Sequence, residues 1–232
     1  MNDAQKLSQA LLTQRSHLLV ALSGAITNCD SAYREWYRRH FRQAISQCAG
    51  VLTTQQYEQH EFDLTLGRFP RLPFKYLTLL DISVDGAEAA GPIIDQMSAL
   101  HSQERSAREP ATWLYYPAGE KVGRSARTLP SLLTVAFANG LPGQEASFRE
   151  WYCTRHVRHA LRVDALVSGQ CFERTQFQKA GAQEAAFATI AIYEQEGTPE
   201  SMLESFASIP PEAFAFPMLD LNRFSESVYR PV

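Results

Sequence analysis

Residues able to transfer protons gather in one short stretch in the second half of the chain. In SFREWYCTRHVRH (147–159), His156 follows Tyr152 by four residues and precedes His159 by three, so on a helix these side chains lie on adjacent faces. An imidazole titrates near neutral pH and can take a proton from a carbon next to a carbonyl group. A nearby tyrosine hydroxyl can donate a hydrogen bond to the resulting enolate. The stretch therefore predicts catalysis by His156 as acid–base, with Tyr152 polarising the substrate.

A structural interpretation of the same stretch stays open, in which His156 bridges helix and sheet and the aromatic residues are core. A Cys153–His156 nucleophile and base pair is disfavoured because no third, orienting group is visible. The four cysteines form no CxxC pair, and we expect free thiols, with Cys153 as buried packing. Scattered histidines without a third ligand predict no metal site.

The tetrapeptide REWY occurs twice, at 34–37 and at 149–152. The same shift of 115 residues places Tyr57 on Phe172 and Glu58 on Glu173, and a shift of 113 aligns 78–82 with 191–195. Conserved order and spacing over so many positions indicate a tandem duplication of a small domain.

Each copy predicts the same order of elements. Apolar segments at 17–26 and 131–141 predict a first strand, and helices follow at 32–48 and 146–163. Thr198-Pro199 is a typical helix opening. The remaining predictions are strands at 51–62, 75–83 and 112–117 with a helix near 89–102, and strands at 166–177, 186–194 and 215–224 with a helix near 199–208.

This order, βαββαβ, is the ferredoxin-like arrangement, which leaves one sheet face bare. A second copy is the natural cover. We therefore predict an α+β fold in which two tandem ferredoxin-like domains cover each other as an intramolecular pseudo-dimer. The expected divisions are an N-terminal helical extension (1–16), a first domain (17–117), a linker (118–130) and a second domain (131–232).

The second copy resembles the dimeric α+β barrel superfamily, in particular its EthD-like branch. There the first helix carries an aromatic pair, three spacer residues and a histidine, matched here by Trp151-Tyr152 and His156. Ala165–Ser168 fits the turn into the second strand. The resemblance implies that the two domains form an intramolecular pseudo-dimeric α+β barrel, with an apolar pocket between the sheet and its cover. Known members include isomerases, cyclases, dehydratases, decarboxylases, cofactor-free monooxygenases and proteins with no assigned activity, and some bind haem through a histidine, so haem stays open.

The first copy departs from this pattern because Phe41 matches His156, while His40 stands one residue early. One residue on a helix is a rotation of about 100°, so His40 projects where His156 does only if the helix is distorted. Asp81 and Glu194 fall at matched positions on the third strand, where an acid can hold a substrate hydroxyl or simply be solvated. The predicted substrate-binding residues are Trp151, His159, Cys171, Glu194, Tyr37 and His40. Five strand aromatics form either the pocket wall or, as we favour, the seal between the two sheets: Tyr57, Phe172, Trp113, Tyr115 and Tyr116.

The charge and the apolar segments of the chain exclude some classes of function. A net charge of −3 argues against a nucleic-acid partner, no apolar run spans a membrane, and no export signal precedes the first copy, so we expect a cytoplasmic protein. The leading hypothesis is a cofactor-independent lyase or isomerase that eliminates, isomerises or decarboxylates a small apolar oxygenated metabolite. The alternatives are a cofactor-free monooxygenase of a phenol or quinol and a non-catalytic ligand-binding or interaction protein. Two pseudo-dimers could associate as a homodimer whether the protein is an enzyme or a non-catalytic binding protein.

Overall fold

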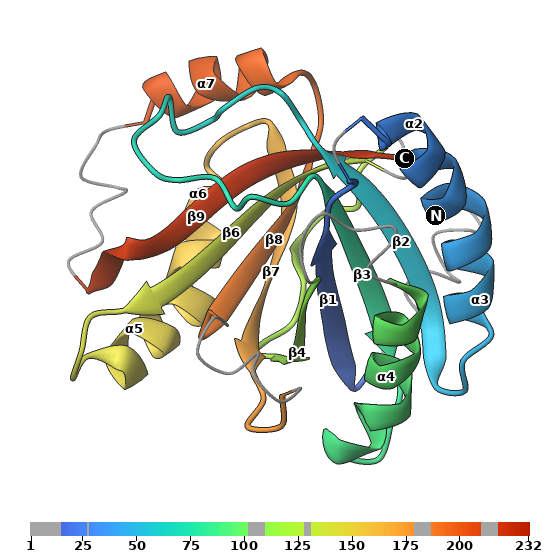
Figure 1. Ribbon diagram of the computed structural model, residues 1–232. Coiled ribbons are helices and arrows are strands. Elements are labelled where there is room, and N and C mark those ends of the chain that lie inside the picture. Colours follow the sequence, from blue (N-terminus) through green and yellow to red (C-terminus); the bar gives the residue numbers. More distant parts are fainter. Residues whose placement is uncertain (1–14, 27, 102–109, 128–130, 179–186, 210–217) are drawn as a thin grey trace.

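The chain folds as two copies of a four-stranded antiparallel sheet with helices on one face (Figure 1). The computed structural model describes residues 15–26, 28–101, 110–127, 131–178, 187–209 and 218–232, so the expected helix at 1–16 lies almost wholly outside the described residues. The first copy comprises β1 (His17–Ser23), α2 (Asp30–Trp36), η1 (Tyr37–Phe41), α3 (Arg42–Ser46), β2 (Val51–Gln59), β3 (Tyr76–Ile82), η2 (Glu88–Ala90), α4 (Gly91–Leu100) and β4 (Ala111–Pro117).

The second copy repeats this order after a short added strand, β5 (Val122–Gly123), which lies in the predicted linker and pairs with β7. Thr198 caps α7 through a reciprocal hydrogen bond with Ser201, as the sequence predicted. Its elements are β6 (Leu132–Gly140), α5 (Glu145–Trp151), η3 (Tyr152–His156), α6 (Val157–Ala160), β7 (Leu166–Arg174), β8 (Thr189–Gln195), α7 (Pro199–Ala207) and β9 (Leu219–Pro231).

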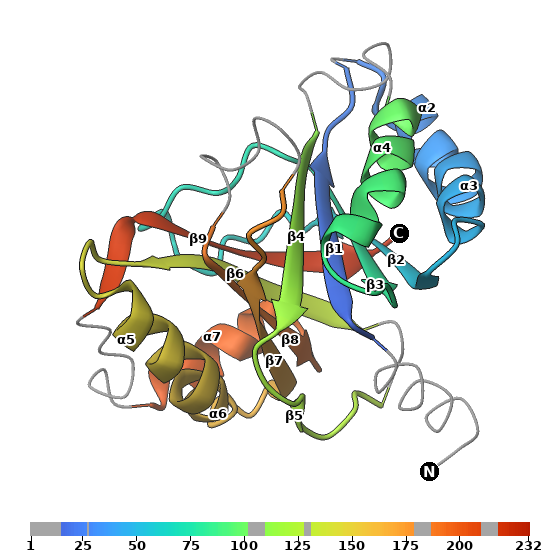
Figure 2. The same ribbon diagram turned by 90° about the horizontal axis from the view of Figure 1, so that it is seen from below.

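The two sheets join into a closed barrel. The strand order is β4-β1-β3-β2-β9-β6-β8-β7-β5, and β4 also pairs with β7, so the second junction closes the ring. Closure leaves the eight main strands without a free edge. Figure 2 shows α2, α3 and α4 on one side of the barrel and α5, α6 and α7 on the other. The predicted pseudo-dimeric α+β barrel is confirmed.

Strand alternation sorts the apolar residues into three cores. One fills the barrel, and each of the other two lies between a sheet and its own helices. Tyr57, Phe172, Trp113 and Tyr115 fill the barrel and seal the two sheets as predicted. The prediction for Tyr116 was wrong, because the residue after Tyr115 on a strand points to the opposite face, and Tyr116 is exposed.

Both first helices contain a π-helical turn at the same place, η1 in the first copy and η3 in the second. Each begins on the tyrosine of REWY. Such turns have i→i+5 hydrogen bonds, insert an extra residue into a helix, and are frequent at functional sites. The duplicated sequence therefore encodes a duplicated distortion.

The prediction of four free thiols was wrong. Cys153 of η3 and Cys171 of β7 form a disulfide, whereas Cys29 and Cys48 are free. The helix and strand bring the pair together although 18 residues separate them in the chain. Within the described ranges, no helix has the length and apolar character needed to cross a membrane.

Candidate functional site

The helix-facing side of the second sheet carries polar groups within an apolar core. On β8, Ile190 and Ile192 pack in the barrel, so Ala191 and Tyr193 point toward the helices. Tyr152 descends from η3 into the same core. Both tyrosine side chains are almost completely buried. Strand alternation and the π-helical turn thus place two phenols in one layer.

A carboxyl group joins these phenols from β9. Phe224 and Val228 pack in the helix-side core, so Glu226, midway between them, faces the same way. Burial, and then the charge of Glu226, raise the pKa of Tyr152, and burial, then Tyr152 and then Glu226, raise the pKa of Tyr193. The three groups are therefore close enough to interact electrostatically. We call Tyr152, Tyr193 and Glu226 the acid cluster.

The acid cluster has unusual protonation behaviour. Burial, and then the negative charge of Asp63, raise the pKa of Glu226 to about 7, although the side chain keeps some contact with solvent. Burial raises the pKa of Tyr152 and of Tyr193 well above the ordinary value, so both phenols stay protonated. Neither hydroxyl has a hydrogen-bond partner among the residues that the structure describes. Two phenol hydroxyls that stay protonated, and can donate hydrogen bonds, therefore lie beside one carboxyl group that changes charge near neutral pH.

Gly169 makes room for one of the phenols. It pairs directly with Tyr193 across β7 and β8. A Cβ atom at Gly169 would lie 2.6 Å from Cδ1 of Tyr193 and 3.1 Å from Cγ1 of Val157. The Tyr193 ring therefore lies over the glycine, and any larger residue would displace it.

A loop of the first copy covers this site. The connection between β2 and β3, teal in Figure 1, crosses β9 and reaches the second copy's core. Leu64 is buried in that core, and Phe69 contacts Phe224 edge-on with ring centroids 4.8 Å apart. Asp63 holds the turn by accepting hydrogen bonds from the backbone N–H groups of Thr65 and Gly67. The site in one copy is thus completed by a loop from the other.

His156 is buried beside the acid cluster but has an unfavourable pKa for acid catalysis. Its ring stacks on Tyr152 and Trp151, with centroids 4.8 and 5.4 Å away. Burial, and then the nearby His159, lower the pKa of His156 to about 3. The imidazole is therefore neutral and weakly basic near pH 7. Its clearest contribution is to hold the ring of Tyr152.

The matching place in the first copy is apolar. Phe41 takes the position of His156 and stacks on Tyr37, with centroids 5.6 Å apart, and Leu80 matches Tyr193. Strand register matches Glu226 with Thr112, because Ala21 pairs with Thr112 as Ala136 pairs with Glu226.

The hydroxyl of Tyr37 is also satisfied. It donates to the carbonyl oxygen of Leu77 and lies 2.7 Å from the hydroxyl oxygen of Thr78, whose counterpart Ala191 offers no such partner to Tyr152. In the second copy, by contrast, two phenols without described partners are electrostatically coupled to one carboxyl group.

Several predicted substrate-binding residues lie elsewhere. His40 is exposed on η1, because the π-helical turn directs Phe41, and not His40, into the core. Tyr37 is a satisfied core residue. Glu194 faces the barrel on the opposite side of the sheet, where it binds Lys121 and Ser168. These three do not contribute to the acid cluster.

The other predicted residues lie near the cluster with different roles. Trp151 is half-buried and packs on His156, and His159 is half-buried one turn further along. Cys171 lies on β7 with its sulfur bonded to Cys153, and its role in substrate binding stays a prediction.

Sequence reasoning missed Tyr193 and Glu226. The last strand was predicted to end at 224, whereas β9 runs to 231 and contains Glu226. The alternation of Phe224, Glu226 and Val228 is the signal that places a carboxyl on an inward face. Among the described residues, no three His, Cys, Asp or Glu side chains gather to hold a metal.

Comparison with known proteins identifies the fold. No family model matches the chain, and no curated protein matches it. A solved structure of a proposed monooxygenase from Fusobacterium nucleatum is 8% identical, with a TM-score of 0.61 over 94% of this chain and 92% of the other.

Two further solved structures give the same result. An anthrone oxidase-like protein is 8% identical, with a TM-score of 0.59 over 94% and 92% of the two chains. A variant of chlorite dismutase from Candidatus Nitrospira defluvii is 9% identical, with a TM-score of 0.56 over 97% and 95%. The resemblance to the dimeric α+β barrel superfamily is confirmed at the level of the fold.

Proposed function

From the dimeric α+β barrel fold and the acid cluster of its second copy, we propose that this protein is a cofactor-independent enzyme acting on a small apolar oxygenated substrate. The substrate lies between the second sheet and its helices. Glu226 accepts a proton from a carbon next to a carbonyl group, or from a phenol. Tyr152 and Tyr193 donate hydrogen bonds to the anion that forms.

The observation that carries this proposal is the pair of buried hydroxyls without described partners beside a carboxyl of raised pKa. A buried donor left unpaired costs about 1–3 kcal/mol, so its retention favours a role toward a ligand. A base with a pKa near the working pH transfers protons efficiently, which favours Glu226 (pKa about 7) over His156 (pKa about 3) as the base. His156 becomes a positioning residue.

The outcome after proton removal decides between two reactions. Return of the proton to another atom gives isomerisation, and loss of a leaving group gives elimination. An electron-rich anion can instead react with dioxygen, which is the monooxygenase alternative, and the names of two similar structures favour keeping it. The same three residues serve the first step in either case.

Anthrone is a suitable probe because it is an apolar ketone with exchangeable protons next to an aromatic system. Under nitrogen in D₂O, proton removal appears as deuterium incorporation at its methylene carbon. In air, oxidation follows C₁₄H₁₀O + O₂ → C₁₄H₈O₂ + H₂O and appears as oxygen uptake. 2-Tetralone provides a second, smaller ketone for the exchange assay.

Replacing Glu226 by Gln is expected to lower the exchange rate by about 10²- to 10⁴-fold without unfolding the protein. Glu194→Gln is the matched control, since that carboxyl faces the barrel and is expected to leave the rate unchanged. Equal rates in Glu226→Gln and the unaltered protein would exclude Glu226 as the base. Binding of both ketones without deuterium exchange or oxygen uptake would favour the non-catalytic alternative. A Soret band formed with added haemin would show that the protein binds haem and would contradict a cofactor-independent reaction.

A further inference from the structure

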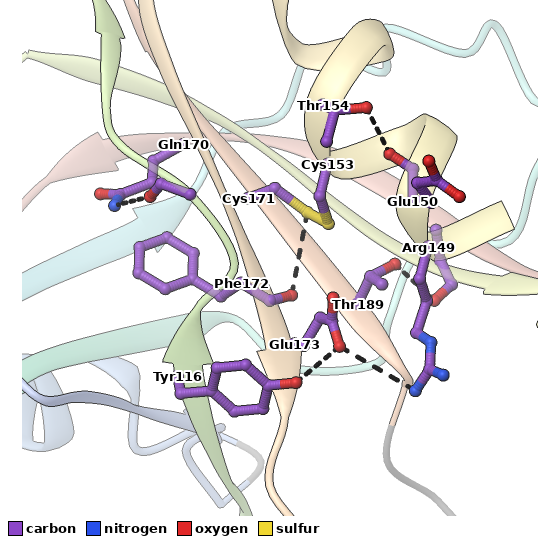
Figure 3. Close-up of a disulfide and its surroundings, with 12 residues drawn as sticks. Tyr116, Arg149, Glu150, Cys153, Thr154, Gln170, Cys171, Phe172, Glu173 and Thr189 are labelled. Atoms are coloured by element: carbon purple, nitrogen blue, oxygen red, sulfur yellow. Dashed lines mark hydrogen bonds and ion pairs between the residues drawn. A yellow bond between two sulfur atoms is a disulfide. The ribbon is translucent and has the colours of Figure 1, made fainter. Parts of the chain in front are cut away.

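The disulfide lies in the wall of the proposed site. Cys153 directly follows Tyr152 in η3, and Cys171 lies on β7 in the helix-side core (Figure 3). Their Cα atoms are 5.1 Å apart, within the usual span for a disulfide. The bond therefore ties the π-helical turn, with Tyr152 and His156 at its ends, directly to the sheet.

The first copy makes the same connection without a covalent bond. There the side-chain amide of Gln56 donates a hydrogen bond of 2.5 Å to the backbone carbonyl oxygen of Tyr37. The 115-residue shift places Gln56 on Cys171 and Tyr37 on Tyr152. The copies thus fasten the start of the π-helical turn to their second strand at equivalent positions, one by a hydrogen bond and the other by a disulfide.

The second copy has no substitute for that hydrogen bond when the disulfide opens. Two thiols cannot replace an amide donor, because a thiol is a weak donor and Cys171 is only 2% exposed in an apolar layer. The matching residue to Cys153 in the first copy is Arg38, which is exposed and takes no part in the tether. Reduction therefore removes the covalent connection and leaves no equivalent hydrogen bond in its place.

Cys153 is the more accessible of the two cysteines. It is partly exposed to solvent, whereas Cys171 is buried. A small thiolate RS⁻ can attack Sγ of Cys153, forming RS–S–Cys153 while Cys171 leaves as a thiolate and takes a proton. A second RS⁻ then displaces Cys153. The sum is disulfide + 2 RSH → two cysteine thiols + RSSR, a two-electron reduction by a thiol/disulfide couple.

We propose that the Cys153–Cys171 disulfide is a redox-responsive latch, which fixes Tyr152 in place when oxidised and releases η3 when reduced by a thiol. Regulation of the acid cluster by this latch rests on the proposed function. The latch itself concerns only the attachment of η3 to β7, so it can be tested without a substrate.

Hydrogen exchange followed by mass spectrometry tests the latch directly. The full-length protein is compared in its oxidised form and after reduction with tris(2-carboxyethyl)phosphine at the same pH. Amides of 152–157 are expected to exchange about 10- to 100-fold faster after reduction, since loss of a cross-link of this size permits local opening. The matching amides, 37–42, are an internal control and are expected to stay unchanged. Equal exchange of 152–157 in both states, or an intact mass showing no disulfide in oxidised protein, would overturn the proposal.

A pair of double variants keeps the test independent of overall stability. Cys153→Arg with Cys171→Gln copies the tether of the first copy and is expected to protect 152–157 under oxidising and reducing conditions alike. Cys153→Ala with Cys171→Ala removes every tether and is expected to match the reduced protein. Protection of the Ala variant equal to that of the oxidised protein would show that the disulfide does not hold η3. A latch that behaves as expected while Glu226→Gln leaves proton exchange unchanged would refute the proposed function alone.

Discussion

Glu226 illustrates how one residue changes the character of a core. It stands on β9 between Phe224 and Val228, where a carboxylate loses hydration and also meets the charge of Asp63. Both effects favour the protonated form. The counterpart in the first copy is Thr112, so the difference between the two helix-side cores is largely a matter of individual side chains.

Replacing Glu226 by Gln is expected to stabilise the protein at high pH. The pKa of this carboxyl is 4.5 ordinarily and about 7 in the folded protein. As the pH rises from 4.5 to 7, Glu226 therefore loses its proton more readily in the unfolded chain, and the free energy of unfolding decreases. The gain in stability from Glu226→Gln is absent near pH 4, grows between pH 4.5 and 7, and reaches about 3 kcal/mol above pH 7. Urea unfolding at pH 4, 6 and 8 measures this difference. A gain independent of pH would show that ionisation of Glu226 is not its source.

Replacing Gly169 by Ala is expected to destabilise the fold by about 1–3 kcal/mol, because the added methyl group would lie 2.6 Å from the Tyr193 ring. Gly119→Ala is the matched control, since an added Cβ there meets nothing within 4 Å. Thermal unfolding of both variants makes the comparison. Equal melting temperatures would mean that the Tyr193 ring moves aside without cost.

At the scale of elements, the paired π-helical turns decide which residues enter the helix-side cores. Each turn directs its last residue inward, Phe41 in one copy and His156 in the other, onto the ring of the REWY tyrosine. The same backbone device thus presents an apolar ring in one copy and an imidazole in the other.

His156→Phe tests whether the imidazole has more than a packing role. The first copy shows that phenylalanine fits a turn of this shape, so we expect the free energy of unfolding to change by less than about 1.5 kcal/mol. If His156 only positions Tyr152, the deuterium exchange rate for anthrone falls much less than in Glu226→Gln. A well-folded variant with no activity would restore His156 as the acid–base group.

At the scale of the whole molecule, Arg15 fastens the two copies across the barrel. Its guanidinium binds Asp81 on β3 of the first copy, with Nη1 2.6 Å from Oδ1, and Gln170 on β7 of the second. It also lies over the ring of Phe172. The side chains of Arg15 and Asp81 are each only 6% exposed, so each buried charge is stabilised mainly by the other.

Arg15→Met is expected to destabilise the protein by about 3–5 kcal/mol, because Asp81 stays buried without its cation. The double variant Arg15→Met with Asp81→Leu removes both charges and is expected to recover much of that loss. Urea unfolding of the three proteins gives the coupling free energy. A single variant as stable as the unaltered protein would show that the ion pair contributes nothing to barrel closure.

Most of the architecture could be predicted from the sequence. The 115-residue repeat gave the number of copies, and apolar periodicity located the helices and strands that the structure describes, because both patterns are local. The bare face of a ferredoxin-like sheet required a cover, so the pseudo-dimer could be predicted as well, and the family resemblance implied that it forms a barrel. The end of β9 was misplaced because the polar residues 225–227 interrupt its apolar pattern, and Glu226 was therefore missed.

The sequence by itself determined that two ferredoxin-like copies form one barrel and that Phe41 and His156 make the copies chemically unlike. Only the tertiary structure decided which polar groups meet. Tyr193, Glu226 and Tyr152 come from two strands and a helix, and Cys153 reaches Cys171 only when η3 packs on β7. Those contacts depend on strand register and on how the π-helical turn packs against the sheet, and both are set by segments far apart in the chain. Burial in the folded protein then shifts the pKa values of these groups, and the residue type alone does not predict such shifts.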